Sequence, residues 1–277
     1  MKYIVKQQCQ LMDFLLQYYP RKQVQQYFKF KQVYVNDVTL TQFNHLCKVD
    51  DVVEVSTHHK EKKVLDVIYE DKDIIVINKP SGLLSVSGGG EKEETAFHYV
   101  SEYLKQKDKG AKAFVVHRLD RDTSGVLMFA KNERIKKALQ DNWNEMVTKR
   151  GYMAIVEGHL KDKQGIIKNY LDESKTQQVY ITKNGGKLAI TKYRVQKENK
   201  QNSLLEVFLE TGRKNQIRVH MQSLKHSIVG DKKYGALSNP IQRLGLHCHV
   251  FAFVHPITKK EIECIAKVPE SFTKLFK

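Results

Sequence analysis

Cysteine is scarce in this sequence, which contains four among 277 residues: Cys9, Cys47, Cys248 and Cys264. None of them forms a closely spaced pair of the kind found in zinc ribbons and redox motifs, so we expect reduced thiols in a cytoplasmic protein. Histidines flank Cys248, but alternate residues of a strand face opposite sides. His247 and Cys248 would therefore not converge on one ion, and no metal site is predicted.

Long hydrophobic runs are also absent. No segment approaches the roughly 18 apolar residues that a membrane-spanning helix needs, and residues 1–8 lack the apolar core of a signal peptide. Acidic residues are outnumbered, since 31 Asp and Glu face 47 Lys and Arg, which leaves a formal charge of +16. This excess favours a polyanionic partner. Nucleic acid comes before a membrane surface, because no basic amphipathic helix carries a large apolar face.

The pattern of the chain predicts two domains, a small module over residues 1–57 and a larger domain over residues 64–277, joined by a charged linker at 58–63. In the module, apolar residues at helical spacing predict one helix that begins near Leu11 and is stopped by Pro20, and a second, basic helix over residues 22–30. Short strands are expected at 33–35 and 52–55.

Strands dominate the larger domain. They are predicted at 64–69, 74–78, 152–156, 179–182, 189–195, 204–210, 246–254 and 262–266. Three helices are expected: one capped by Thr95, one over residues 132–143, and one after Gly212 that buries Ile217 and leaves Arg218 off its apolar side. Strict alternation of strands and helices is missing, which predicts an α+β fold with a mixed, largely antiparallel sheet.

One stretch, residues 116–132, concentrates charge between two apolar runs. Its centre holds six ionisable or hydroxyl side chains: His117, Arg118, Asp120, Arg121, Asp122 and Thr123. A strand, a charged loop and a second strand is the simplest interpretation. Charges between buried strands must be paired. Tight turns also collect Asp, Thr, Ser and Gly for backbone reasons, so the pattern alone fits both a functional and a structural loop.

Residues 117–120 (HRLD) with 123–125 (TSG) resemble the signature of the RluA-type pseudouridine synthases. Further matches follow in family order at 78–82 (NKPSG), 152–158 (YMAIVEG), 211–221 (TGRKNQIRVHM), 230–235 (GDKKYG) and 246–247 (LH). Ahead of them, residues 21–55 resemble the small RNA-binding fold first described in a ribosomal small-subunit protein, here termed S-four-like; a generic helical-hairpin adaptor also fits. The whole chain resembles the longer members, which modify large-subunit ribosomal RNA.

The resemblance implies catalytic roles for three residues. Asp120 would start the reaction, either by attacking the sugar or by removing a ribose proton. Arg218 would be its charge partner, because an enclosed carboxylate stays ionised only beside a cation. Tyr152 would stack on the detached uracil and assist removal of the carbon-bound proton. On pattern alone, Tyr152 also fits an ordinary core position of a strand.

Four further residues are implied at the substrate. Arg118 would fill the space left by a flipped nucleotide, Leu246 would form an apolar pocket wall or an ordinary core position, His117 would anchor the loop, and Arg213 would contact the RNA. No metal or organic cofactor is implied, because the substrate supplies both the leaving group and its acceptor. The family usually has His where this chain has Asn215, a change expected to alter RNA contacts without removing the catalytic groups.

The expected partner is RNA, with ribosomal RNA first and transfer RNA also open, and with no membrane. The protein is expected to act as a monomer. A non-catalytic RNA-binding or ribosome assembly factor is the alternative from another class.

Overall fold

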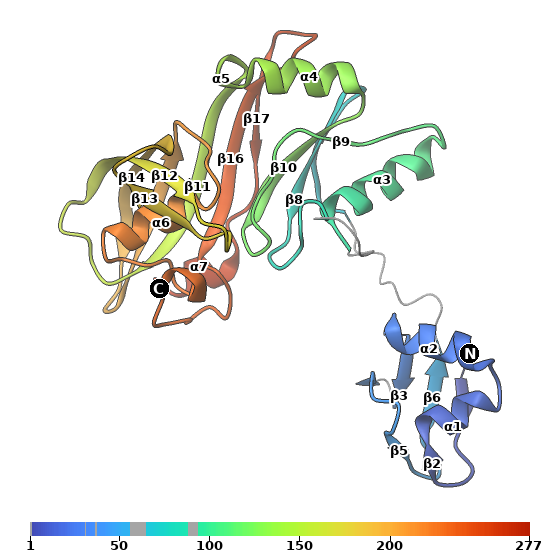
Figure 1. Cartoon of the computed structure of the whole chain (residues 1–277). Helices are drawn as coiled ribbons and strands as arrows, with labels where there is room; N and C mark the ends of the chain where they lie inside the picture. Colours follow the sequence, from blue (N-terminus) through green and yellow to red (C-terminus); the bar gives the residue numbers. More distant parts are fainter. Residues whose placement is uncertain (1, 31, 37, 56–64, 88–93) are drawn as a thin grey trace. The chain divides into compact units, whose positions relative to one another are not determined.

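The computed structural model describes residues 2–30, 32–36, 38–55, 65–87 and 94–277 (Figure 1). The chain divides into two compact units, Met1–Val64 and Leu65–Lys277. The predicted linker, residues 58–63, lies outside the described residues. Each unit has a hydrophobic core of its own.

The first unit is a small module of short strands and two helices. Its elements are β1 (Lys2–Ile4), β2 (Cys9–Gln10), α1 (Leu11–Leu16), α2 (Arg21–Lys29), β3 (Val33–Val35), β4 (Val38–Thr39), β5 (Leu46–Cys47) and β6 (Val52–Val55). Both predicted helices and both predicted strands are present. The sheet has the order β1-β6-β3-β4, and β2 pairs with β5. β1, β2, β4 and β5 were not predicted, because two or three residues show little periodicity; β3, equally short, was marked by the Asn-Asp turn sequence that follows it.

The β2–β5 pair brings two of the four cysteines together. Cys9 and Cys47 face each other across this ladder, and both thiols are free. Burial raises the pKa of Cys47 to about 11, which keeps this thiol protonated and unreactive at neutral pH.

The second unit is built on one large sheet. Its elements are β7 (Val67–Glu70), β8 (Ile74–Lys79), α3 (Ala96–Lys107), β9 (Phe114–Val115), β10 (Ser124–Ala130), α4 (Glu133–Asp141), α5 (Trp143–Met146), β11 (Val147–Glu157), β12 (Gln164–Glu173), β13 (Val179–Thr182), β14 (Lys187–Glu198), β15 (Asn202–Leu209), α6 (Gln216–Ser223), the 3-10 turn η1 (Lys232–Tyr234), β16 (Leu246–Val254), β17 (Glu261–Ile265) and α7 (Glu270–Lys274).

The strand order of this sheet is β13-β12-β14-β15-β11-β16-β10-β8-β7, with β17 beside β16 and β9 beside β10. Strands β10 and β16 run parallel, whereas β11 and β15, like most neighbours, run antiparallel. The predicted α+β fold with a mixed, largely antiparallel sheet is confirmed. Helix α6 packs on β13 and β14 (Figure 1).

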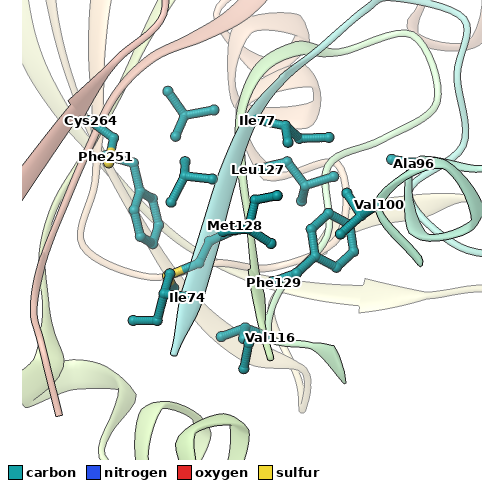
Figure 2. Close-up of a cluster of buried hydrophobic side chains, with 14 of the residues drawn as sticks. Ile74, Ile77, Ala96, Val100, Val116, Leu127, Met128, Phe129, Phe251 and Cys264 are labelled. Carbon is teal, nitrogen blue, oxygen red and sulfur yellow. The ribbon is translucent and has the colours of Figure 1, made fainter. Parts of the chain in front are cut away.

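Strand β10 lies at the centre of the largest core because all seven of its residues are buried. Its side chains alternate between the two faces of the sheet. Phe129 points toward Val100 of α3, while Met128 lies on the other face with Ile74 and Phe251 (Figure 2). The apolar run that follows the charged loop therefore fixes that loop to the most buried part of the molecule.

Gly125 allows β10 and β16 to approach each other. It has a φ of +112°, and a Cβ atom at this position would lie 2.0 Å from the backbone oxygen of Cys248. Any other residue would separate the two strands or strain the backbone. The end of the 117–123 loop is thereby held beside the beginning of β16.

Several element predictions for this unit were wrong. The described residues contain α5, α7 and η1 in addition to the three expected helices. The helix expected over 132–143 ends at Asp141, because Asn142 leaves helical geometry with a φ of −113° and a ψ of 33°. Strand β12 was missed entirely: its exposed positions alternate with half-buried and buried ones near an edge of the sheet, so its apolar signal is weak.

Within the residues that the structure describes, none of the helices has the length and apolar content needed to cross a membrane.

Candidate active site

The loop that carries Asp120 is held by a buried lysine. The ammonium of Lys79 donates hydrogen bonds to three backbone oxygens, those of Pro80 (2.9 Å), Leu83 (2.7 Å) and Arg121 (2.9 Å). Lys79 is fully buried, and burial lowers its pKa to about 8. One side chain therefore joins the turn after β8 to the residue that follows Asp120.

His117 holds the beginning of the same loop. Its Nε2 accepts a hydrogen bond from the backbone N–H of Met128 (3.1 Å), and its ring stacks on Phe251 with centroids 4.8 Å apart. Burial lowers the pKa of His117 to about 3, so the imidazole is neutral and able to accept at neutral pH. Ser85 secures the next part of the loop through two hydrogen bonds with the backbone of Leu119 (2.8 and 3.0 Å).

Arg218 of α6 joins Asp120 to a second carboxylate, that of Asp231. Its Nη1 lies 3.2 Å from Oδ2 of Asp120. Its Nε and Nη2 donate to the two oxygens of Asp231, both at 2.7 Å, in a bidentate pair. Burial alone would lower the pKa of Arg218, but the two carboxylates outweigh it and raise that pKa above its usual value. The side chains of Asp231 and Arg218 are 1% and 14% exposed, and that of Asp120 is 31% exposed, so Asp120 is the open end of this row.

Asn215 is a direct neighbour of this ion pair. It is buried and adopts a left-handed conformation with a φ of 53° just before α6. Its Oδ1 accepts from Nη1 of Arg218 (3.1 Å), and its Nδ2 donates to the hydroxyl of Tyr234 (2.9 Å). The Arg218 guanidinium also lies over the Tyr234 ring, 4.9 Å from its centroid. The departure from the family pattern thus falls on a residue that orients Arg218.

Tyr152 and Leu246 come from neighbouring strands. Tyr152 lies on β11 opposite Cys248 of β16, and Leu246 lies opposite Ala154. Leu246 is almost fully buried and packs in an apolar cluster that includes Ile217 of α6. Burial raises the pKa of Tyr152 well above its usual value. A phenol that stays protonated can stack and donate a hydrogen bond, which favours stacking over a part in proton removal.

A cleft of about 1050 Å³ brings all the predicted residues together. It is lined by His117, Arg118, Asp120, Tyr152, Arg213, Arg218 and Leu246, among others. Arg118 and Arg213 are exposed at this cleft. Nε of Arg213 donates to the backbone oxygen of Leu188 (3.0 Å), so part of its bonding capacity is already used.

Sequence patterns did not indicate three residues of this region. Asp231 was part of a recognised motif but was interpreted as a turn residue. Arg150 and Trp143 both line the cleft. Arg150 lies two residues before Tyr152 on β11, and the period of two along a strand places both side chains on one face. That spacing was the available signal for Arg150.

Among the described residues, no group of three His, Cys, Asp or Glu side chains is placed to hold a metal ion. The chemistry that the cleft offers is that of a carboxylate beside an arginine, with an aromatic ring and an apolar wall for a flat ring of a substrate. Five cations that line the cleft would suit a nucleotide chain: Arg118, Arg121, Arg150, Arg213 and Lys214. Together, the fold and the cleft would suit an enzyme that acts on a base within a nucleic acid.

Comparison with known proteins identifies the family. The sequence profile described as RNA pseudouridylate synthase matches residues 73–223. Ribosomal large subunit pseudouridine synthase D of Zymomonas mobilis is 35% identical over 246 residues, which cover 83% of this chain and 77% of that protein. The RNA pseudouridine synthase YhcT of Bacillus subtilis, itself uncharacterized, is 33% identical over 263 residues, covering 91% and 86%. The chain belongs to the RNA pseudouridylate synthase family, whose members are isomerases.

A solved structure agrees with the fold. Human RNA pseudouridylate synthase domain containing 4 superposes with a TM-score of 0.63 over 76% of this chain and 92% of that one, at 22% identity. The match to the family profile begins at residue 73, so the S-four-like nature of the first unit stays a prediction.

Proposed function

We propose that this protein converts specific uridines of large-subunit ribosomal RNA to pseudouridine, with Asp120 as the catalytic group. The observation that carries the proposal is the row Asp231–Arg218–Asp120, with separations of 2.7 and 3.2 Å, which ends at a cleft beside Tyr152. The name of the Zymomonas mobilis relative supports ribosomal RNA of the large subunit as the substrate.

The reaction leaves the composition of the nucleotide unchanged. The bond from ribose C1′ to uracil N1 breaks, the detached base turns, and a new bond forms from C1′ to C5. The proton on C5 is lost and N1 gains one. Asp120 would act in the first step, either by attacking C1′ or by removing a ribose proton. Both routes need an ionised carboxylate, and the guanidinium of Arg218 lies 3.2 Å from it as a charge partner.

The remaining cleft residues would hold the base while it is free. The ring of Tyr152 offers a stacking face, and such stacking is worth about 1–3 kcal/mol per base. Leu246 would close the apolar wall. A stacked uridine must leave its RNA helix to reach Asp120, at a cost of a few kcal/mol. Exposed Arg118 is suited to fill the vacated space, and Arg213 to bind the backbone.

We also propose that the first unit binds RNA. Helix α2 buries Val24, Tyr27 and Phe28, and its Arg21, Lys22 and Lys29 are exposed. An exposed basic row on a small module is the usual electrostatic footprint of RNA binding. We further propose action as a monomer in the cytoplasm, where the free cysteines would stay reduced.

The test is to map pseudouridines in ribosomal and transfer RNA from a strain with the gene, without it, and with the Asp120→Asn variant. Pseudouridine should vanish from defined positions of large-subunit ribosomal RNA in both mutant strains. If pseudouridine is lost from transfer RNA and not from ribosomal RNA, transfer RNA is the substrate. Unchanged pseudouridine in every RNA would contradict an enzymatic role and favour a binding or assembly factor.

A further inference from the structure

Trp143 and Arg150 form a second surface in the cleft, beyond the pocket of the target base. Trp143 is the only tryptophan of the chain. The guanidinium carbon of Arg150 lies 6.0 Å from the centroid of its ring. Both side chains are half-buried and line the cleft. Trp143 begins α5, which packs against β11 and β16 (Figure 1).

Arg150 carries a charge that is only partly satisfied. Within the described ranges, no carboxylate lies within ion-pair distance of it, and its one hydrogen bond runs from Nη2 to the backbone oxygen of Glu210 (2.6 Å). A guanidinium has five N–H donors. Burial lowers the pKa of Arg150, which indicates that its charge is poorly solvated. Such a cation is unfavourable until an anion reaches it.

The neighbouring residues keep this cation accessible. A Cβ atom on Gly212 would lie 2.6 Å from Nη1 of Arg150, so the absence of a side chain there leaves that nitrogen its space. Arg150 and Tyr152 share one face of β11, about 7 Å apart along the strand. A nucleotide beside the one held at Tyr152 would therefore reach Arg150.

We propose that Trp143 and Arg150 form a second nucleotide subsite, in which a base flanking the target uridine stacks on Trp143 and its phosphate binds Arg150. The subsite rests on the proposed function, since it takes the same RNA strand. Every base has an aromatic face, so stacking on Trp143 would add affinity without strong sequence preference. The contact between Arg150 and a phosphate would make part of the RNA affinity depend on salt concentration.

Because Trp143 is unique in the chain, its fluorescence reports directly on this place. The full-length protein is titrated with a short oligouridylate while binding is followed separately by anisotropy of a label on the RNA. The tryptophan emission should be quenched with the same dissociation constant as the anisotropy change. An absence of quenching overturns the subsite, whether the oligouridylate binds elsewhere or fails to bind.

Variants separate a binding role from a structural one. Trp143→Leu and Arg150→Gln should weaken RNA affinity about tenfold or more and raise KM with little change in kcat. Trp143→Phe should restore most of the affinity lost in Trp143→Leu. Arg150→Gln should also reduce the slope of log affinity against log salt by about 0.7. The matched control is Lys149→Gln, which removes one charge from the same strand, where Lys149 pairs with Glu263 at 2.9 Å.

A failure of the subsite can be distinguished from a failure of the proposed function. If Asp120→Asn abolishes isomerisation while Trp143→Leu and Arg150→Gln bind RNA as the wild type does, the function stands and the subsite is wrong. If Arg150→Gln loses affinity with an unchanged salt slope and a lowered melting temperature, the side chain is structural and the proposal also fails.

Discussion

The carboxylate of Asp231 should control both the stability of the catalytic unit and its activity. Asp231 is nearly fully buried and holds Arg218 by two hydrogen bonds of 2.7 Å. In Asp231→Asn the amide keeps the size of the side chain but removes its charge and one of its two acceptors. Arg218 then keeps only Asp120 as a charged partner, at 3.2 Å, and becomes free to turn toward it.

The expected magnitude follows from the burial of the pair. Removing one partner of a buried ion pair costs about 3–5 kcal/mol. Arg218 retains some exposure and the contact with Asp120, so the lower end, about 3 kcal/mol, applies. For a unit of this size, each kcal/mol shifts the melting temperature by about 2–4 °C. Asp231→Asn should therefore melt about 6–12 °C below the wild type.

A matched change at a surface pair serves as the control. Glu270→Gln also replaces a carboxylate by an amide, but Glu270 and its partner Lys274, 2.8 Å away, are both exposed. Such pairs are worth about 0–1 kcal/mol. Melting followed by circular dichroism compares the two variants, and release of label from uracil C5 gives their kcat. If both melt within about 2 °C of each other and both keep full activity, the role assigned to Asp231 is wrong.

Three further predictions concern the loop and the charge. Burial lowers the pKa of Lys79 from 10.5 to about 8, so between these pH values the unfolded chain binds more protons than the folded one. As pH rises through this window, the wild type should gain up to about 3 kcal/mol of unfolding free energy relative to Lys79→Met, measured by urea denaturation. Parallel pH profiles of the two proteins would contradict this prediction. Gly125→Ala should lower the free energy of unfolding by about 3 kcal/mol or more, because the added Cβ would lie 2.0 Å from the backbone oxygen of Cys248. Gly82→Ala is the control: Gly82 also has a positive φ, +83°, but nothing lies within 4 Å of the added Cβ, so the same denaturation should show a loss of about 1 kcal/mol. Affinity for ribosomal RNA should fall steeply with salt: for each phosphate contact, log affinity should drop by about 0.7–0.9 per log unit of salt concentration. An affinity that does not change with salt would mean that the +16 charge lies on a solvated surface and does not contact phosphates.

Local sequence signals predicted those elements whose cause is local. Strand β10 is a continuous apolar run, and Thr95 and Asn132 each accept a hydrogen bond from a backbone N–H of the helix that they cap (3.1 and 2.9 Å). Strand β12 was not predicted, because its exposed positions alternate with positions that are mostly only half-buried and so give a weak apolar signal. Its place in the sheet depends on β14, which pairs with it through tertiary folding.

The residues of the site were likewise predicted where a short motif marks them and missed where a tertiary contact gives them their role. Asp120, Tyr152 and Arg218 were found because each lies in a short motif, and the cleft now brings them together. The role of Asp231 was not predicted, because the sequence of a turn does not indicate which distant side chain its carboxylate will bind, here Arg218 of α6. The two roles proposed for Trp143 and Arg150 likewise depend on a contact between α5 and β11 that no motif encodes.

The most direct test of the central claim compares two aspartates of one loop. Asp120 faces Arg218 in the cleft, whereas Asp122 is exposed. Purified Asp120→Asn and Asp122→Asn variants are assayed for release of label from uracil C5 of ribosomal RNA that lacks pseudouridine, and for binding of that RNA. We expect Asp120→Asn to bind RNA as the wild type does but to release no label, and Asp122→Asn to remain active. Full release of label by Asp120→Asn would contradict the assignment of Asp120 as the catalytic group.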